Sequence, residues 1–266
     1  MLGLARSGLA AAAALERRGV EVVRADQELG NDEDLGLIGG VGLLVKSPGV
    51  PAEAPLVAAA RERGVPVWSE IELASRLLPN PILGVTGTNG KTTTAEWLGF
   101  MLGAPVAGNV GRALSELDGE VEPEQLVVVE LSSFQLEDVD RFRPRIAVLL
   151  NLEPDHLDRH GSFEAYRDAK LRIFENQTEA DTAVVPRDLD HEVRAHRVEF
   201  AADDRLPAEP SLRGAHNREN AAAAVAAARA AATAAAAFSR LCRPRTAGSA
   251  GNRSPAANST RFARTS

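Results

Sequence analysis

The sequence predicts an α/β protein built on parallel sheets, and three observations support this fold class. Short apolar runs rich in β-branched residues alternate with longer helix-forming stretches along most of the chain. Glycine-rich or polar segments follow several of the apolar runs, as at the ligand-binding edge of open parallel sheets. The chain has 266 residues with 44% hydrophobic side chains, which is enough for one large or two ordinary domains with buried cores.

The expected strands are apolar runs bounded by turn residues or charges, and they cover residues 20–26, 42–49, 81–87, 126–133, 145–151 and 182–186. The expected helices cover residues 7–18, 52–63, 92–102, 163–174 and 217–237. The Leu-Pro-Asn-Pro segment at 78–81 is a stiff break, because each proline disfavours helix at the residue before it. We therefore expect one domain at 1–78 and a second at 79–238.

The charge balance limits the possible partners. The chain has 30 Lys and Arg against 37 Asp and Glu, a net charge of -7, whereas phosphate-backbone binding requires clustered positive charge. The one cysteine, Cys242, cannot form an internal disulfide, and no apolar run approaches the roughly 20 residues of a membrane span. The opening residues lack the pattern of an export signal. We expect a cytoplasmic protein with no nucleic-acid or membrane partner.

The last 28 residues differ from the rest in composition. Residues 239–266 contain six Arg and no Asp, Glu or Lys, and they lack apolar periodicity. We expect a disordered tail, or a segment read in a shifted frame from about residue 238. An arm that binds an anion is the functional alternative.

A glycine-rich turn follows the expected strand at 81–87. The run Gly87-Thr88-Asn89-Gly90-Lys91-Thr92-Thr93 lets backbone N–H groups face one concavity at the start of a helix, Lys91 supplies charge to outer phosphates, and Thr92 offers a hydroxyl to Mg²⁺. The strict phosphate-loop spacing is not met, because its first glycine falls one residue early, at Gly84. A tight strand-to-helix turn with an incidental lysine is the alternative.

Polar residues follow the next two expected core strands. Glu130 ends the run LVVVE, where a carboxylate can hold the Mg²⁺ that bridges phosphates, although capping of the following segment is an alternative role. His156 lies in the polar cluster NLEPDHLDRH after residue 150, where it is a candidate metal ligand or charge partner, and a solvated loop histidine is the alternative.

Six motifs in order resemble those of the Mur ligase family: GVTGTNGKTT at 84–93, GNVG at 108–111, ELSSFQL at 130–136, NLEPDHLDRH at 151–160, YRDAKLRI at 166–173 and HNREN at 216–220. They are most similar to those of the members that add D-glutamate. The resemblance covers the first two of three domains in that family. It implies a Rossmann-like domain that binds a UDP substrate, followed by a central domain of the P-loop ATPase type.

The resemblance also implies roles for individual residues. It places Gly87–Thr93 and Asn220 on ATP, Thr92 and Glu130 on Mg²⁺, and His156 with Lys170 on a second Mg²⁺, where Lys170 carries a carbamate. Lys91, His156 and Lys170 are then the catalytic set. The UDP substrate is expected to contact Arg6, Ser7, Asp26, Ser47 and Asn109, and Ser47 opens an S-P-G turn typical of the family.

The implied reaction is the ATP-dependent addition of D-glutamate to UDP-N-acetylmuramoyl-L-alanine through an acyl phosphate, in peptidoglycan precursor synthesis, by a monomer. Two departures from the family pattern bear on this. The first strand and the third domain of the family have no counterpart, so we expect impaired turnover. The alternatives are an inactive module that binds nucleotide or UDP-sugar, and a ligase similar to folylpolyglutamate synthase.

Overall fold

The computed structural model describes residues 1–207, 210 and 214–241, and it confirms the α/β fold class. A small parallel sheet pairs β1 (Leu44–Lys46) with β2 (Val67–Ser69). The large sheet has six strands in the order β4-β5-β3-β6-β7-β8, and every neighbouring pair is parallel. Its strands are β3 (Ile82–Thr86), β4 (Val106–Gly108), β5 (Val127–Glu130), β6 (Ile146–Leu149), β7 (Thr182–Pro186) and β8 (His196–Phe200).

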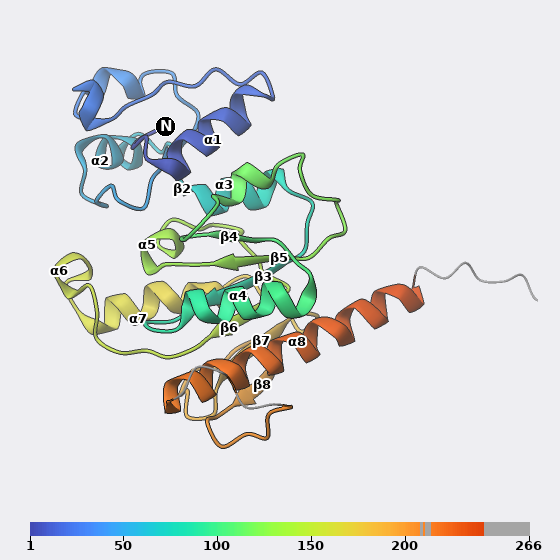
Figure 1. The fold of residues 1–266 in the computed structure, drawn as a ribbon. Coiled ribbons are helices and arrows are strands. Elements are labelled where there is room, and N and C mark those ends of the chain that lie inside the picture. The colour runs from blue at the N-terminus through green and yellow to red at the C-terminus, as the bar shows by residue number, and fades with distance from the viewer. Residues whose placement is uncertain (208–209, 211–213, 242–266) are drawn as a thin grey trace, which may run out of the picture.

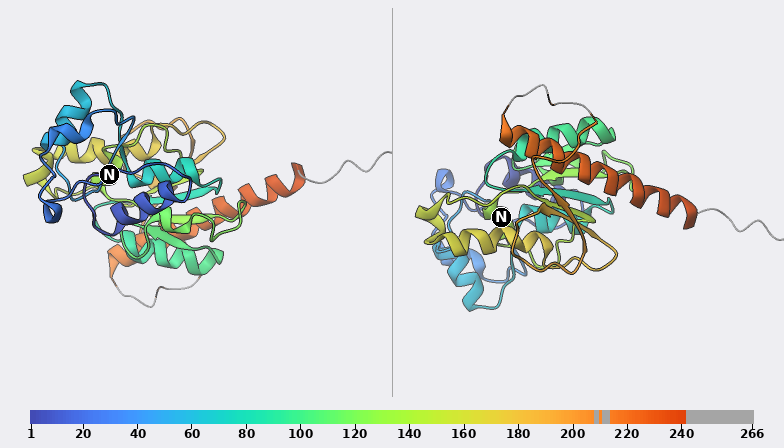
Figure 2. Two further views of the ribbon diagram at one scale, coloured as in Figure 1. Left: turned by 90° about the horizontal axis from the view of Figure 1, so that it is seen from above. Right: turned by 90° about the horizontal axis from the view of Figure 1, so that it is seen from below.

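Both faces of the large sheet are covered, so every residue of its central strands β3, β5 and β6 is buried, and most of these residues are apolar. In β3, Leu83 and Val85 join one core cluster, whereas Ile82 faces the cluster on the opposite side. This alternation is the two-residue period of a strand. The first face is covered by α4 (Lys91–Leu102) and α8 (Ala215–Leu241), which pack against each other (Figure 2).

The opposite face is covered by α3 (Glu70–Leu77), α5 (Ser133–Leu136) and α7 (Phe163–Leu171), while α6 (Leu157–His160) lies at its end beside α7. Figure 1 shows the N-terminal residues as a lobe on the α3 side of the sheet, with α8 on the other side. That lobe contains α1 (Arg6–Glu16) and α2 (Pro55–Glu62). The lobe therefore meets the large sheet across α3 and the loops next to it.

The strand expected to be missing from the first sheet is represented by a single residue. Leu2 forms parallel bridges to both Ala25 and Lys46, so it occupies the central position between them. The turn after it is tight, since a Cβ at Gly8 would lie 1.9 Å from the carbonyl oxygen of Gly3. Glycine is therefore required where the chain enters α1.

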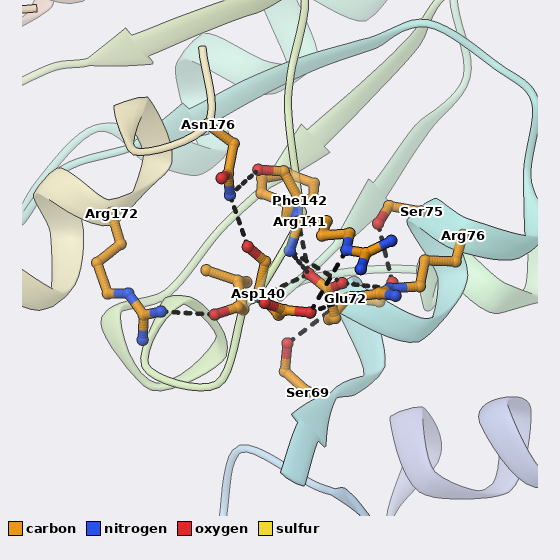
Figure 3. A network of polar contacts seen from close by, with 10 residues as sticks. Ser69, Glu72, Ser75, Arg76, Asp140, Arg141, Phe142, Arg172 and Asn176 are labelled. Atoms are coloured by element: carbon orange, nitrogen blue, oxygen red, sulfur yellow. Dashed lines mark hydrogen bonds and ion pairs between the residues drawn. The ribbon is translucent and has the colours of Figure 1, made fainter. Parts of the chain in front are cut away.

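A buried carboxylate fixes α3 to the loop that follows α5. The Glu72 side chain accepts hydrogen bonds of 2.8 to 3.1 Å from the backbone N–H groups of Asp140, Arg141 and Phe142. It is also paired with Arg76 one turn along the helix (Figure 3). Ile71 and Ala74 of the same helix join the core of the large sheet, while Leu73 packs with Met1 and the α1 residues of the lobe. Helix α3 thus contacts both parts, and a domain boundary at residue 78 stays a prediction.

Several expected elements differ from the observed ones. Residues 20–26 form no strand and contribute only the bridge at Ala25. The short strands β2, β4 and β8 and the helix α3 were not expected from the sequence. None of the helices in the described ranges is long and apolar enough to cross a membrane. Helix α8 continues to Leu241, three residues into the expected tail, and residues 242–266 lie outside the described part.

Candidate active site

The candidate site lies where β3, β5 and β6 end. The sheet register pairs Val85 with Glu130 and Thr86 with Leu149, so the glycine-rich turn after β3 lies between Glu130 on one side and the Asn151 segment on the other. After β3 the chain adds β4 and β5 on one side of that strand and then β6 on the other side. Open parallel sheets bind ligands at the point where the strand order reverses in this way. The edge thus brings the phosphate-loop candidate next to a carboxylate.

Asn151 holds the glycine-rich turn in shape. Its Oδ1 atom accepts hydrogen bonds from the backbone N–H groups of Thr88 (3.0 Å) and Asn89 (2.8 Å), and its Nδ2 atom donates to the Asn89 carbonyl (3.1 Å). Tyr166 donates to the Thr88 hydroxyl at 3.0 Å from the other side. Neither residue was singled out in the sequence. Asn151 is the first polar residue after a core strand, and this position is the signal that could have identified it.

The second glycine of the turn lies against α8. Gly90 has φ +82° and is the N-cap of α4, and a Cβ added there would lie 2.2 Å from Oδ1 of Asn220. Asn220 is 4% exposed. The structure therefore places Asn220 beside the phosphate-loop candidate, with room for no side chain between them.

Lys91 and Glu130 form the charged part of the edge. Lys91 is the first residue of α4, and its Nζ donates to the Thr88 carbonyl at 2.8 Å. Burial lowers the pKa of Lys91, and the charges of Glu130 and Asp155 oppose that shift. Glu130 is 2% exposed and accepts a hydrogen bond from Nδ2 of Asn109 at 3.1 Å. Asn109 is thereby located at the site entrance.

Lys170 is buried in α7 and points to the same turn. Its Nζ donates to the carbonyl of Gly87 at 2.8 Å and lies 4.6 Å from the centre of the Tyr166 ring. Burial, followed by repulsion from Lys91, lowers the pKa of Lys170 to about 7, and only Asp155 acts in the opposite direction. A large fraction of this amine is therefore neutral at physiological pH, as a lysine that reacts with CO₂ must be.

His156 has an unusual backbone. It adopts φ +50° as the N-cap of α6, and among the described residues it is the one non-glycine residue with positive φ. Its side chain is exposed, lies 3.5 Å from Asp155, and has its ring centre 6.4 Å from that of Tyr166. Residues outside glycine adopt this conformation at a cost, and such strain concentrates at functional sites.

A second histidine, His160, was not predicted from the sequence as a site residue. Its Nε2 lies 2.9 Å from the Ser133 hydroxyl and its Nδ1 lies 3.0 Å from Glu137. Burial lowers the pKa of His160 and raises the pKa of Glu137, so both shifts disfavour an ion pair between them. The ring also stacks on Phe134, with centres 5.0 Å apart.

The residues expected to bind the UDP substrate gather around the turn before α1. Arg6 and Ser7 begin that helix, and the Arg6 guanidinium donates to the carbonyl of Gly111 in the loop that carries Asn109. Ser47 donates to the Gly3 carbonyl at 2.7 Å. Asp26 accepts backbone N–H bonds from Leu4 and Glu28, which lower the pKa of its carboxyl group. The turn, the S-P-G segment and the Asn109 loop thus adjoin one another.

The oxygen ligands at this edge suit a Mg²⁺ ion that also binds phosphate oxygens better than they suit a metal held by protein ligands alone. In the described part of the chain, no group of three or more His, Cys, Asp or Glu side chains could hold a metal ion. Mg²⁺ commonly uses one or two carboxylates and completes its shell with phosphate oxygens and water. The buried Glu130 and the exposed hydroxyl of Thr92 meet that need. As an ammonium ion Lys170 repels a cation, whereas a carbamate on the same nitrogen would offer anionic oxygens to a metal.

Comparisons with known proteins agree with this geometry. Residues 85–202 match the Mur ligase middle domain. UDP-N-acetylmuramoylalanine--D-glutamate ligase of Anaeromyxobacter dehalogenans is 41% identical over 84% of this chain and 62% of its own length. The enzyme of the same name from Trichlorobacter lovleyi is 44% identical over 71% of this chain and 48% of its own length.

Solved structures show the same fold. UDP-N-acetylmuramate:L-alanyl-gamma-D-glutamyl-meso-diaminopimelate ligase from Neisseria meningitides superposes with a TM-score of 0.58 and 22% identity, over 86% of this chain and 92% of that one. The chain spans about three fifths or less of the length of the curated relatives named above. From the middle-domain match, residues 85–202 belong to the Mur ligase middle-domain family, and the chain resembles these ligases over most of its length.

Proposed function

We propose that the chain is the nucleotide- and UDP-substrate-binding part of an ATP-dependent ligase that adds D-glutamate to UDP-N-acetylmuramoyl-L-alanine. The single observation that carries the proposal is the junction of the glycine-rich turn, Lys91 and the buried Glu130 at one sheet edge, facing Lys170. The names of the relatives favour the D-glutamate reaction over the folylpolyglutamate one. Both substrates, the cytoplasmic setting and the monomeric state are part of the proposal.

In the first step, the alanyl carboxylate attacks the γ-phosphorus of ATP, the bond to the bridging oxygen breaks, and ADP leaves. In the second, the amine of D-glutamate attacks the carbonyl carbon of the acyl phosphate, inorganic phosphate leaves, and the nitrogen loses a proton. Thr92 and Glu130 would hold Mg²⁺, which would supply positive charge to neutralise the phosphates. No protein nucleophile is required by this sequence of steps.

The residues of this chain have separable tasks in that reaction. Backbone N–H groups of the glycine-rich turn, held by Asn151, orient the phosphates, and Lys91 stabilises charge on the transferring group. Asn220 lies where α8 meets the turn, near the expected adenine. Arg6, Ser7, Asp26, Ser47 and Asn109 orient the UDP part, with the link from Arg6 to Gly111 joining the two halves of that surface. Lys170 as carbamate, with His156, would hold the metal nearest the carboxylate.

The first step can be tested without D-glutamate. Incubation of the purified chain with ATP, Mg²⁺, UDP-N-acetylmuramoyl-L-alanine and hydroxylamine should trap the acyl phosphate as a hydroxamate. We expect ADP and hydroxamate in equal amounts, and both at a much lower rate from Lys91→Ala. Arg167→Ala is the matched control, because Arg167 is an exposed cation on α7 that pairs with the neighbouring Asp168.

The second candidate is an inactive module that binds nucleotide or UDP-sugar through the same two surfaces and transfers no phosphoryl group. It predicts binding of ATP and the UDP-sugar by calorimetry with no ADP or hydroxamate. Absence of both binding and turnover would refute both candidates.

A further inference from the structure

Three side chains beside the site form a hydrogen-bonded series that the proposed reaction does not use. Ser133 Oγ lies 2.9 Å from Nε2 of His160, whose Nδ1 lies 3.0 Å from Oε1 of Glu137. The His160 side chain is 2% exposed and Ser133 is equally buried, whereas Glu137 is 26% exposed at its side chain. Both ring nitrogens are therefore engaged within the protein.

The number of protons on these three groups determines which ring nitrogen of His160 carries its proton. Burial lowers the pKa of His160, which favours the neutral ring with its single N–H, and an ionised carboxylate can only accept. The proton therefore lies on Nδ1 and is donated to Glu137. Nε2 then accepts the hydroxyl proton of Ser133, which satisfies all three groups.

The order Ser-His-Glu is that of a nucleophilic triad, but the surroundings exclude that role. A polar pocket of about 190 Å³ is lined by Glu137 and His160 together with Glu53 and Arg159, and its lining does not include Ser133. The Ser133 hydroxyl thus lies at the end of the series that is away from the pocket, where no substrate carbonyl could reach it. A nucleophile must face the substrate, so the series acts on other protein groups.

The group on which it acts is His156. His160 donates its backbone N–H to the carbonyl of His156 at 3.0 Å, one helical turn away, so both rings lie on one side of α6. Both also contact Phe134, whose ring centre is 5.0 Å from His160 and 5.1 Å from His156. Fixing His160 therefore fixes the short helix, whose first residue follows the left-handed His156.

We infer that Ser133, His160 and Glu137 form a relay that sets the direction of the His156 ring. Each is a positioning residue. The relay joins α5, three residues beyond Glu130, to α6, and so relates the two expected metal-ligand segments to each other. The inference deepens the proposed function, because the role of His156 rests on it.

The test uses side-chain NMR of the ¹⁵N-labelled chain with no nucleotide or substrate present. The chain has five histidines, and variants of single histidines assign their rings. We expect His160 as the Nδ1–H tautomer and His156 with ring protons shifted by Phe134. In Glu137→Ala the tautomer preference and the His156 shift should both be lost. Glu137→Gln, whose amide oxygen still accepts, should retain both, and Glu53→Ala should match the unaltered chain as a control from the same pocket.

An Nε2–H tautomer in the unaltered chain would overturn the relay, as would unchanged His156 shifts in folded Glu137→Ala. If Glu137→Ala does not fold, the tautomer of the unaltered chain and the Glu137→Gln spectrum decide the matter. The measurement requires no ATP, so a negative hydroxamate assay contradicts the ligase proposal and leaves the relay intact. If hydroxamate forms but the NMR spectra show the other tautomer or an unchanged His156, the relay alone is contradicted.

Discussion

The burial of Lys170 should make folding stability depend on pH above neutrality. Its pKa falls from 10.5 to about 7 in the folded protein. The unfolded chain thus binds a proton at Lys170 that the folded chain has partly released, and stability rises with pH wherever the unfolded state binds more protons. Lys170 is destabilising at pH 7 and becomes less so as the pH rises toward 10.5.

The magnitude follows from linkage at about 1.4 kcal/mol per pKa unit. The full shift corresponds to a cost of order 4 to 5 kcal/mol at pH 7, and the part released between pH 7 and pH 9 is about 2 kcal/mol. Lys170→Met keeps a long side chain in the same space without a titrating group. The difference in unfolding free energy between the unaltered chain and Lys170→Met should therefore change by about 2 kcal/mol across this pH range, in favour of the unaltered chain.

Denaturant unfolding at pH 7, 8 and 9 in buffers free of CO₂ measures this difference. Other titrating groups, such as the buried N-terminal amine, are common to both proteins and cancel. Arg167→Met is the matched control on α7, because an arginine does not titrate in this range. Parallel pH profiles for the unaltered chain and Lys170→Met would refute the assignment of a neutral buried amine. In a separate measurement, added ¹³C-bicarbonate should give a carbamate NMR signal in the unaltered chain that Lys170→Met lacks.

The remaining predictions concern the turn and the α3 contact. Lys91→Ala should lower the rate of hydroxamate formation by a factor corresponding to about 3 kcal/mol with the Tm little changed, and a rate near that of the unaltered chain would exclude its role. Gly90→Ala should lose nucleotide affinity in calorimetry, since its Cβ would lie 2.2 Å from Asn220, and Asn220→Ala in the same chain should restore part of it. If the double variant binds no better, steric conflict is not the cause. Glu72→Ala should destabilise the protein by about 3 kcal/mol in denaturant unfolding, because it leaves buried N–H groups unpaired, whereas the exposed Glu62→Ala should stay within about 0.5 kcal/mol.

The sequence predicted those elements whose residues carry a strong local signal. Apolar runs at β3, β5 and β6 are buried on both faces, so their composition alone indicates core strands, and the glycines and Lys91 that follow indicate a phosphate loop. Strand β8 was not predicted because its sequence, His-Arg-Val-Glu-Phe, is that of a partly exposed edge strand. Residues 20–26 have a typical strand composition, yet the adjacent segment supplies one pairing residue, Leu2, and the ladder ends there.

The side-chain contacts of the site could not be predicted from spacing. Asn151, Tyr166 and His160 act through partners that are between 27 and 78 residues away along the chain, and only the sheet order brings these partners together. The role suggested for Lys170 came from resemblance, and its burial supplies a physical reason for it. Burial, and after it the nearby Lys91 cation, destabilises the ammonium form of this amine.

The contacts of α3 and of Lys46 bear on how firmly the lobe and the phosphate-loop edge are joined. Glu72 pairs with three successive N–H groups in the loop after α5, and Lys46, just before the S-P-G turn, forms a buried ion pair of 3.0 Å with Asp138 in the same loop. The lobe expected to hold the UDP part is thus connected to the segment that begins at Glu130 through groups that are costly to separate. Removing one partner of a buried pair costs about 3 to 5 kcal/mol, because the other charge is left buried and unpaired. The lobe and the phosphate-loop edge should therefore move as one body, so that the surface proposed for the UDP part keeps its position relative to the glycine-rich turn.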